Sequence, residues 1–316
     1  MKVEDIKKVG VVGAGLMGHG IAINSALWGY PTTIHDISDE LLQKAMKNVK
    51  FSLDIFVGEG LIDRKRADET IKRITPTTDL AKLAQNSDFI TEVIVEKSEA
   101  KYELFNKLDI LCPPHTIIAS NTSSLVLSDF GRGVKRQDKI VITHYFSPPH
   151  FVPGVEVAKG PHASDETFNI TYDLMKKWKK VPIRILKEKP GYLINRIQMA
   201  IWKEAYTLWA EGVATPEEID LGVRTTCGFR MPHEGPMKRH DMGGSWRWPK
   251  EVRERMAEHQ FDNISEPTPE QAKKIAQHAI DGKTWLIAPD KFDEAFDIAY
   301  REYARRLKDL YWGKAD

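Results

Sequence analysis

The feature that most restricts the fold of this chain is a cluster of glycines directly after a short apolar stretch near the N-terminus. Residues 8–12 are typical of a buried strand, and the pattern G-x-G-x-x-G follows them. The first glycine allows a tight turn, the second lets the backbone approach a pyrophosphate, and the third lets a helix pack closely on the strand. The start of that helix favours a phosphate. The residues predicted to bind the cofactor in this turn are Gly13, Gly15, Leu16, Met17 and Gly18.

An acidic residue ends the next predicted strand. Residues 31–35 are typical of a strand, and Asp36 follows them, about 20 residues beyond the glycines, where a carboxylate binds the adenosine ribose of NAD. Neither Ile37 nor Ser38 is an arginine that would accept a 2′-phosphate, and the charge of Asp36 would repel one. The pattern therefore predicts NAD rather than NADP.

The first half of the chain alternates between predicted strands and helices. Residues 98–111 are typical of an amphipathic helix, and residues 37–72 of a helical pair broken at 58–60. Such alternation predicts an α/β fold with a parallel, doubly wound sheet of Rossmann type. Ligands bind beyond the carboxyl ends of the strands of such sheets. The further predicted strands are 87–95, 116–119, 139–143 and 154–157, so that Glu96, the polar run 120–124 and His144 lie at those ends.

A proline-rich loop separates His144 from Glu156. The prolines at 148, 149 and 153 predict a compact loop, because proline fixes φ and donates no hydrogen bond to a sheet. The loop could return the chain so that the histidine lies beside the carboxylate. That arrangement suits a general base, because the carboxylate holds the imidazole tautomer and stabilises the imidazolium. The alternative is a capped histidine and a strand glutamate without a catalytic role.

Composition argues against several classes of function. The chain has 316 residues, enough for two domains, and its 46 basic and 45 acidic side chains give no electrostatic footprint for nucleic acid or a membrane surface. Cys112 and Cys227 lack metal-ligand spacing, so we expect no metal, and two cysteines in so long a chain indicate a reducing compartment. No apolar run is long enough to span a membrane, and the charged first residues do not form a signal peptide. We expect a cytoplasmic protein that binds a small-molecule substrate and neither nucleic acid nor membrane.

The charged residues 187–189, followed by Pro190 and Gly191, predict a linker between two domains. We place the NAD-binding domain at 1–188 and an all-α C-terminal domain at 189–316. A long amphipathic helix follows the linker and ends near Gly212, and its tryptophans suit a core or a subunit interface better than a ligand. The residues predicted to form its buried stripe are Ile194, Ile197, Ile201, Ala205 and Leu208.

Further motifs occur in order over roughly the first 240 residues. They are EVIVE at 92–96, KYELF at 101–105, SNTSS at 120–124, His144 with Glu156, and PGYLINR at 190–196. Together with the glycine pattern and Asp36, they resemble the 3-hydroxyacyl-CoA dehydrogenase superfamily. The resemblance implies NAD-dependent oxidation of a 3-hydroxyl to a 3-oxo group, and a dimer-forming helical domain, so we expect a homodimer.

The resemblance also implies roles for individual residues. His144 and Glu156 would be the catalytic pair, and Ser123 and Asn195 would contact the reacting oxygen of the substrate. The implied contacts of the cofactor are Glu96 and Lys101 near the nicotinamide half, Ser123, and Ser147, which stands where the family usually has asparagine.

Departures from the family pattern bear on the substrate. Ser52 matches a serine that contacts CoA in the family, but Glu59 stands where a lysine is expected, and the family's glycine-rich tail is reduced to residues 282–285. Gly228-Phe-Arg230 and its spacing to Gly235 resemble the gulonate, carnitine and pyridoxine-breakdown dehydrogenases. We therefore favour a small polar 3-hydroxy acid whose free carboxylate meets Arg230, a side chain suited to bidentate binding. The alternatives are a 3-hydroxyacyl-CoA of the 3-hydroxybutyryl-CoA type and a structural, crystallin-like protein. Other candidates to meet the carboxylate are His233, Lys238, Arg239 and His240.

Overall fold

The computed structural model describes residues 1–232, 235–242, 249–252, 268–280 and 289–312. The chain divides into two compact units, one formed by Met1–Asn195 with Phe296–Asp316 and the other by Arg196–Ala295. This division differs from the predicted one at 188/189, because the chain's last helix returns to the first unit. Its residues Tyr300, Ala304 and Leu307 are buried in the core of that unit.

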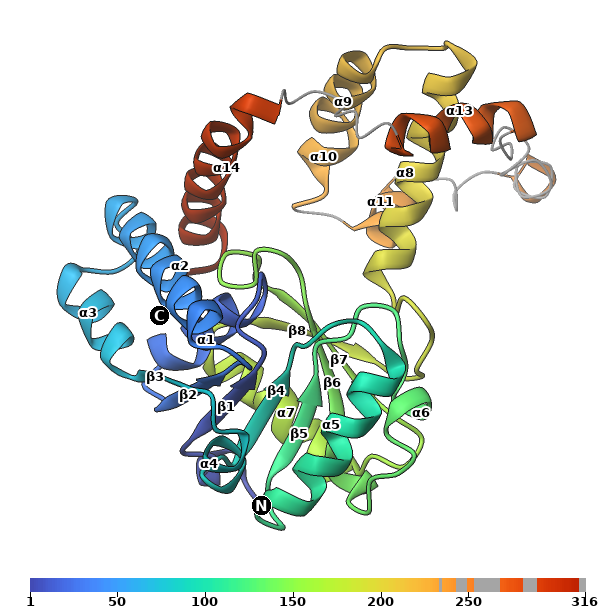
Figure 1. Ribbon diagram of the computed structural model, residues 1–316. Helices are drawn as coiled ribbons and strands as arrows, with labels where there is room; N and C mark the ends of the chain where they lie inside the picture. The colour runs from blue at the N-terminus through green and yellow to red at the C-terminus, as the bar shows by residue number, and fades with distance from the viewer. Residues whose placement is uncertain (233–234, 243–248, 253–267, 281–288, 313–316) are drawn as a thin grey trace. The chain divides into compact units, whose positions relative to one another are not determined.

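The first unit contains one eight-stranded sheet (Figure 1). Its strand order is β3-β2-β1-β4-β5-β6-β7-β8, and every neighbouring pair is parallel except the antiparallel pair β6–β7. The predicted doubly wound α/β fold is confirmed. The edge strands β3 and β8 are additional to the predicted ones, and each contains a proline, which a sheet tolerates at its edge. The strands are β1 (Val9–Val12), β2 (Thr32–His35), β3 (Ile74–Thr77), β4 (Phe89–Glu92), β5 (Ile117–Ser120), β6 (Ile140–Tyr145), β7 (Gly154–Lys159) and β8 (Val181–Ile185).

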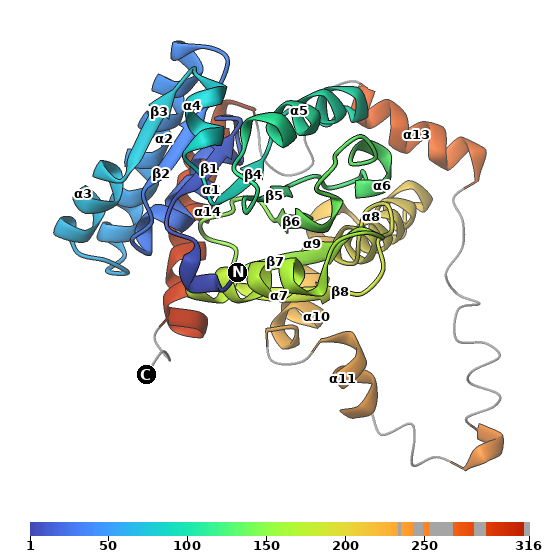
Figure 2. The same cartoon turned by 90° about the horizontal axis from the view of Figure 1, so that it is seen from below.

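Helices cover both faces of the sheet (Figure 2). The helical pair predicted at 37–72 is confirmed as α2 and α3, which begin at side-chain caps: Ser38 accepts from Leu41 N at 3.3 Å and Asp63 from Arg66 N at 2.7 Å. The helices of this unit are α1 (Gly18–Leu27), α2 (Asp39–Gly58), α3 (Arg64–Lys72), α4 (Leu80–Gln85), α5 (Ser98–Leu111), α6 (Leu127–Phe130), α7 (Asp165–Lys177) and most of α14 (Phe292–Leu307).

A hydrophobic core lies on each face of the sheet. One core includes Ile21 of α1, Val49 of α2 and Leu174 of α7, and the other includes Leu83 of α4 and Phe105 of α5. The central strands β1, β4 and β5 are buried along their whole length, as expected for parallel strands covered on both sides. The rigid sheet thus positions the loops at its carboxyl edge.

The C-terminal helix α14 packs against α2 and the loop after β6. The Tyr300 ring centroid lies 4.8 Å from that of Phe151 and 6.4 Å from that of Phe51. Arg305 Nε donates to Glu59 Oε2 at 2.8 Å, and an Arg301 Nη atom lies 3.5 Å from Glu59 Oε1. The helix therefore contacts α2 at Phe51 and at Glu59, the residue that caps its C-terminal end.

The described residues of the second unit form helices joined by turns and contain no strand, which confirms the predicted all-α C-terminal part. The predicted buried stripe of α8 is wrong: Ile197 and Ile201 are each 40% exposed and the other three residues are only half-buried, because no other described element of this unit covers them. Trp202 is also exposed, at 42%. The helices are α8 (Ile194–Glu211), α9 (Pro216–Thr225), α10 (Cys227–Arg230), α11 (Pro236–Met242) and α13 (Pro269–Ile280).

Candidate active site

The hairpin of β6 and β7 brings His144 and Glu156 together. The two residues are direct partners in the antiparallel register, so their side chains project from the same face of the sheet. His144 Nδ1 lies 2.7 Å from Glu156 Oε2, and the residues are 3% and 0% exposed. The proline-rich loop therefore returns the chain as the sequence predicts.

This geometry determines which nitrogen of His144 can accept a proton. The carboxylate only accepts hydrogen bonds, so Nδ1 carries the hydrogen and Nε2 presents its lone pair. Within the described residues, Nε2 makes no hydrogen bond, and the imidazole is flanked by the rings of Phe146 and Tyr192, with centroids 4.6 and 5.7 Å away. An oriented imidazole of this kind is suited to act as a general base.

The second oxygen of the Glu156 carboxylate binds the start of α8. Glu156 Oε1 accepts the backbone N–H groups of Leu193 and Ile194 at 3.0 and 2.8 Å. The next residue, Asn195, donates from Nδ2 to the carbonyl oxygen of Ser123 at 3.2 Å. The structure thus brings together the two residues that the sequence analysis assigns to the reacting oxygen.

Glu96 organises the loop that follows β5. Its Oε1 accepts from Thr122 Oγ1 at 2.5 Å, from Ser124 Oγ at 2.9 Å and from the backbone N–H groups of Ser123 and Ser124 at 2.9 and 3.0 Å. Burial opposes ionisation, but the Thr122 hydrogen bond and the charge of Lys101 outweigh it and lower the pKa of Glu96 to about 2. The ionised carboxylate therefore holds this loop at the carboxyl edge of the sheet.

Lys101 forms ion pairs with both Glu92 and Glu96. The residue is 1% exposed, and its ammonium lies 2.6 Å from Glu92 Oε1 and 3.3 Å from Glu96 Oε2. Glu92, which is fully buried on β4, also accepts from Ser120 Oγ at 2.5 Å. No role for Glu92 was predicted from the sequence. An acidic residue inside an apolar strand nevertheless indicates a buried ion pair, because buried carboxylates are rare unless they are paired.

The glycine turn between β1 and α1 forms a cradle that fits a dinucleotide. Gly13 has φ +112°, and a Cβ on Gly18 would lie 1.9 Å from the Gly13 carbonyl oxygen, so neither position accepts a side chain. A Cβ on Gly15 would meet no atom within 4 Å, which leaves open space beside the backbone at the helix start. The neighbouring Leu16 is 67% exposed and Met17 is half-buried. These observations match the requirements of a pyrophosphate at this turn.

Two other predicted cofactor residues lie at the same edge of the sheet. Asp36 follows β2, and its Oδ2 accepts the N–H of Ala14 in the glycine turn at 2.6 Å. Ser147 is exposed at the beginning of the loop after β6. The loops at the carboxyl ends of β1, β2, β4, β5 and β6 therefore carry the predicted cofactor contacts of the first unit, except Lys101, which lies on α5.

Arg230 belongs to the other unit. It is the last residue of α10 and is exposed, as are Lys238 and Arg239 of α11. His233 and the 282–285 tail lie outside the described residues. All residues of the candidate site given above belong to the first unit.

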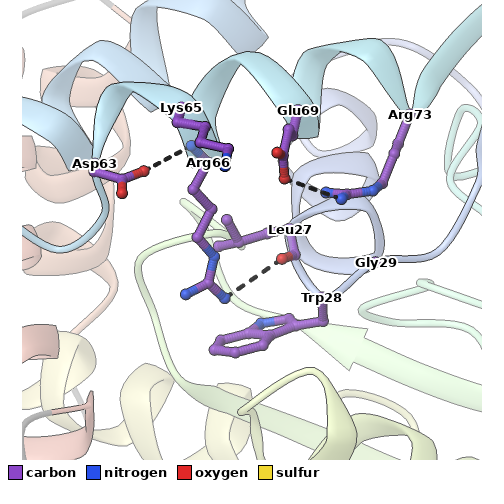
Figure 3. Close-up of a pocket in the computed structure, with 8 residues that line it drawn as sticks. All are labelled: Leu27, Trp28, Gly29, Asp63, Lys65, Arg66, Glu69 and Arg73. Atoms are coloured by element: carbon purple, nitrogen blue, oxygen red, sulfur yellow. Dashed lines mark hydrogen bonds and ion pairs between the residues drawn. The ribbon is translucent and has the colours of Figure 1, made fainter.

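A hollow of about 420 Å³ lies elsewhere, at the C-terminal end of α1 (Figure 3). The Arg66 guanidinium lies 4.5 Å from the Trp28 ring centroid and donates to Leu27 O at 3.5 Å, while Arg73 donates to Ala26 O at 3.4 Å. These arginines bind the last carbonyl groups of α1, which have no partner within the helix. None of the predicted site residues lines this hollow.

Among the described residues, no group of three or more His, Cys, Asp and Glu side chains could hold a metal ion. None of the described helices combines the length and the apolar character needed to cross a membrane.

Comparison with known proteins identifies the family. Residues 8–189 match the model of the 3-hydroxyacyl-CoA dehydrogenase NAD binding domain, and residues 191–284 match that of the 3-hydroxyacyl-CoA dehydrogenase C-terminal domain. Human mitochondrial hydroxyacyl-coenzyme A dehydrogenase is 32% identical over 285 residues, which cover 88% of this chain and 89% of that protein. The rat lambda-crystallin homolog is 29% identical over 229 residues, 72% of each chain.

A solved structure supports the same assignment. (S)-3-hydroxybutyryl-CoA dehydrogenase from Ralstonia eutropha has a TM-score of 0.69 and 30% identity, and the match covers 88% of this chain and 94% of that one. The superfamily resemblance and the NAD cofactor are thereby confirmed. The chain belongs to the 3-hydroxyacyl-CoA dehydrogenase family and is an NAD-dependent oxidoreductase acting on CH–OH groups.

Proposed function

We propose that this enzyme oxidises the 3-hydroxyl of a small 3-hydroxy acid to the 3-oxo product, with His144 as the general base. The observation that carries this proposal is the buried 2.7 Å contact between His144 Nδ1 and Glu156 Oε2, which leaves Nε2 as the proton acceptor. The retention of each catalytic residue type supports this enzyme role over the crystallin-like alternative.

The chain's own residues account for the proton transfer. The hydroxyl proton passes to His144 Nε2, and Glu156 stabilises the resulting imidazolium. Ser123 and Asn195 hold the substrate oxygen, which becomes the carbonyl oxygen as the C–H bond breaks. NAD, held by the glycine turn at Gly13, Gly15 and Gly18 and by Asp36, would supply the hydride acceptor for that carbon. In the reverse direction His144 returns the proton to the forming alkoxide.

The surroundings of α2 support a free acid rather than a CoA thioester. By the sequence resemblance, Ser52 corresponds to a serine that contacts CoA in the family, and Glu59 stands where a lysine is expected. Ser52 is 1% exposed and its hydroxyl is buried, while Glu59 is engaged by Arg305 and Arg301 of α14. Because Ser52 is buried and Glu59 is paired with the arginines of α14, neither side chain is presented to a ligand.

The second candidate is a 3-hydroxyacyl-CoA dehydrogenase. It is favoured by the names of the relatives, since human hydroxyacyl-coenzyme A dehydrogenase matches over 88% of this chain. For such a substrate, α14 would have to leave α2 or CoA would have to bind elsewhere.

A substrate screen separates the two candidates. NADH formation is followed by absorbance with a panel of 3-hydroxy acids and their CoA thioesters. We expect turnover of free acids, and we expect Arg230→Met to lower kcat/KM for them by about 1.5–3 kcal/mol, the contribution of a hydrogen bond to a charged group. Oxidation of 3-hydroxybutyryl-CoA with all free acids inert would decide for the second candidate.

We also propose that the enzyme is a homodimer. On α8 of the second unit, Ile197, Met199, Ile201 and Trp202 are each at least 40% exposed. An exposed apolar helical surface of this kind is typical of a protein–protein interface. The proposal does not require a position of one unit relative to the other.

A further inference from the structure

The turn that leads from β8 into α8 has an unusual backbone. Gly191 and Tyr192 are consecutive left-handed residues, with φ of 77° and 47°. For a tyrosine this conformation is sterically unfavourable, so the surrounding structure must compensate. Tyr192 is 2% exposed, and its hydroxyl donates to the carbonyl oxygen of Leu125 at 2.6 Å.

This conformation directs the first amides of α8 towards one carboxylate. The N–H groups of Leu193 and Ile194 donate to Glu156 Oε1, and the other oxygen of Glu156 holds His144 Nδ1. The N-terminus of a helix has free N–H groups and a positive dipole, so it favours a buried anion. Glu156 therefore has hydrogen-bond partners at both oxygens, although it is fully buried.

We propose that Glu156 holds the catalytic base and the first turn of α8 in one fixed arrangement, and that Tyr192 is a positioning residue for it. The inference rests on the proposed role of His144. Asn195 follows Ile194 directly, so the amide that contacts Ser123 and the imidazole that receives the proton are placed by the same carboxylate. Groups held in this way need no rearrangement when the imidazolium forms.

A structural role alone and a positioning role predict different kinetics. Tyr192→Phe keeps the ring and removes the hydrogen bond to Leu125, so we expect kcat to fall about three- to tenfold, the effect of one lost hydrogen bond, with KM for NAD within about twofold of wild type. The matched control is Tyr145→Phe, because Tyr145 is equally buried and its hydroxyl contacts Met175 Sδ at 3.0 Å. The control should keep kcat, and an equal loss in both variants would contradict the positioning role.

Hydrogen exchange at the amides of Leu193 and Ile194 tests the carboxylate without measuring activity. Glu156→Ala should raise their exchange at least about tenfold, because the one oxygen that accepts from both amides is lost. Glu156→Gln should keep them protected through its amide oxygen. The same variant should nevertheless lose turnover, because its NH₂ group would donate to His144 Nδ1 and leave the hydrogen on Nε2.

The outcomes separate this inference from the proposed function. Protection in Glu156→Ala within about twofold of wild type would overturn the inference, and if that variant does not fold, unchanged exchange in Tyr192→Phe would do so. His144→Gln should keep both amides protected. If His144→Gln instead kept its turnover, the proposed catalytic role would fail, while the exchange data would still decide whether Glu156 holds α8.

Discussion

The proposed catalytic chemistry depends on two side chains, those of the buried pair His144 and Glu156. His144→Gln should lower turnover by about two to four orders of magnitude, the usual contribution of a positioned acid–base group. NAD affinity should change little, because the proposed proton acceptor serves the substrate. Steady-state kinetics and NAD titration measure both quantities. His115→Gln is the control, since its side chain is 51% exposed and pairs with Asp88; a His144 variant as active as this control would refute the assignment.

A second histidine, His150, should affect stability rather than catalysis. It is 1% exposed, both ring nitrogens lack a hydrogen-bond partner within the described residues, and the rings of His19, Phe56, Phe151 and Tyr300 surround it. Burial, with the nearby His19 and Lys180, lowers the pKa of His150 well below 6.5. Burial likewise lowers the pKa of Lys180 to about 7.

The direction of the pH dependence follows from these shifts. Below pH 6.5 His150 is protonated in the unfolded chain but not in the folded chain. The free energy of unfolding therefore falls by up to about 1.4 kcal/mol for each unit by which the pH decreases. Lys180 adds little slope below about pH 6, because there it is charged in both states, and its contribution grows as the pH rises towards and above 7. Urea unfolding between pH 5 and 7 should show a shallower slope for His150→Phe. Parallel curves for the two proteins would contradict this explanation.

At the scale of elements, α14 joins the first unit by two kinds of contact. The Tyr300 side chain is buried among aromatic rings, whereas Arg305 pairs with Glu59 while its own side chain is 54% exposed. An exposed ion pair contributes about 0.2–1 kcal/mol, but truncation of a buried aromatic ring costs about 3–5 kcal/mol. Burial therefore dominates the attachment of this helix.

Denaturation of two variants measures this difference. Tyr300→Ala should lower the free energy of unfolding of the first unit by about 3 kcal/mol or more, and Arg305→Gln should lower it far less. High salt should weaken only the contribution of Arg305, because salt screens exposed charges. A larger loss in Arg305→Gln than in Tyr300→Ala would show that the ion pair holds the helix instead.

For the whole molecule, the exposed apolar residues of α8 predict self-association. Trp202→Glu should shift the protein from dimer to monomer, because a charge without a partner in an apolar interface costs several kcal/mol. Light scattering coupled to gel filtration measures the mass. The control is Ile110→Glu, an equal change of charge at an apolar side chain that is 83% exposed on α5. A monomeric wild-type protein would refute the proposed homodimer.

The sequence by itself determined the local features of this protein. The glycine spacing, the acid after β2 and the alternation of strands and helices depend on neighbours within a few residues or on a fixed period, so they predicted the Rossmann-type sheet, the glycine turn and NAD. The pairing of His144 with Glu156 could also be predicted, because a single loop connects the two strands that carry these residues. The edge strands β3 and β8 were not predicted, because a proline weakens the sequence pattern of a strand although it does not prevent a position at the edge of a sheet.

Only the tertiary structure decided the contacts between residues far apart in the chain. No spacing indicates that Glu92 binds Lys101 across β4 and α5, or that Glu156 also accepts the amides of residues 193 and 194. The return of α14 to cover Glu59 joins positions 246 residues apart. Such contacts form because burial of apolar surface brings the elements together, and each buried charge must then find a partner among the groups it meets.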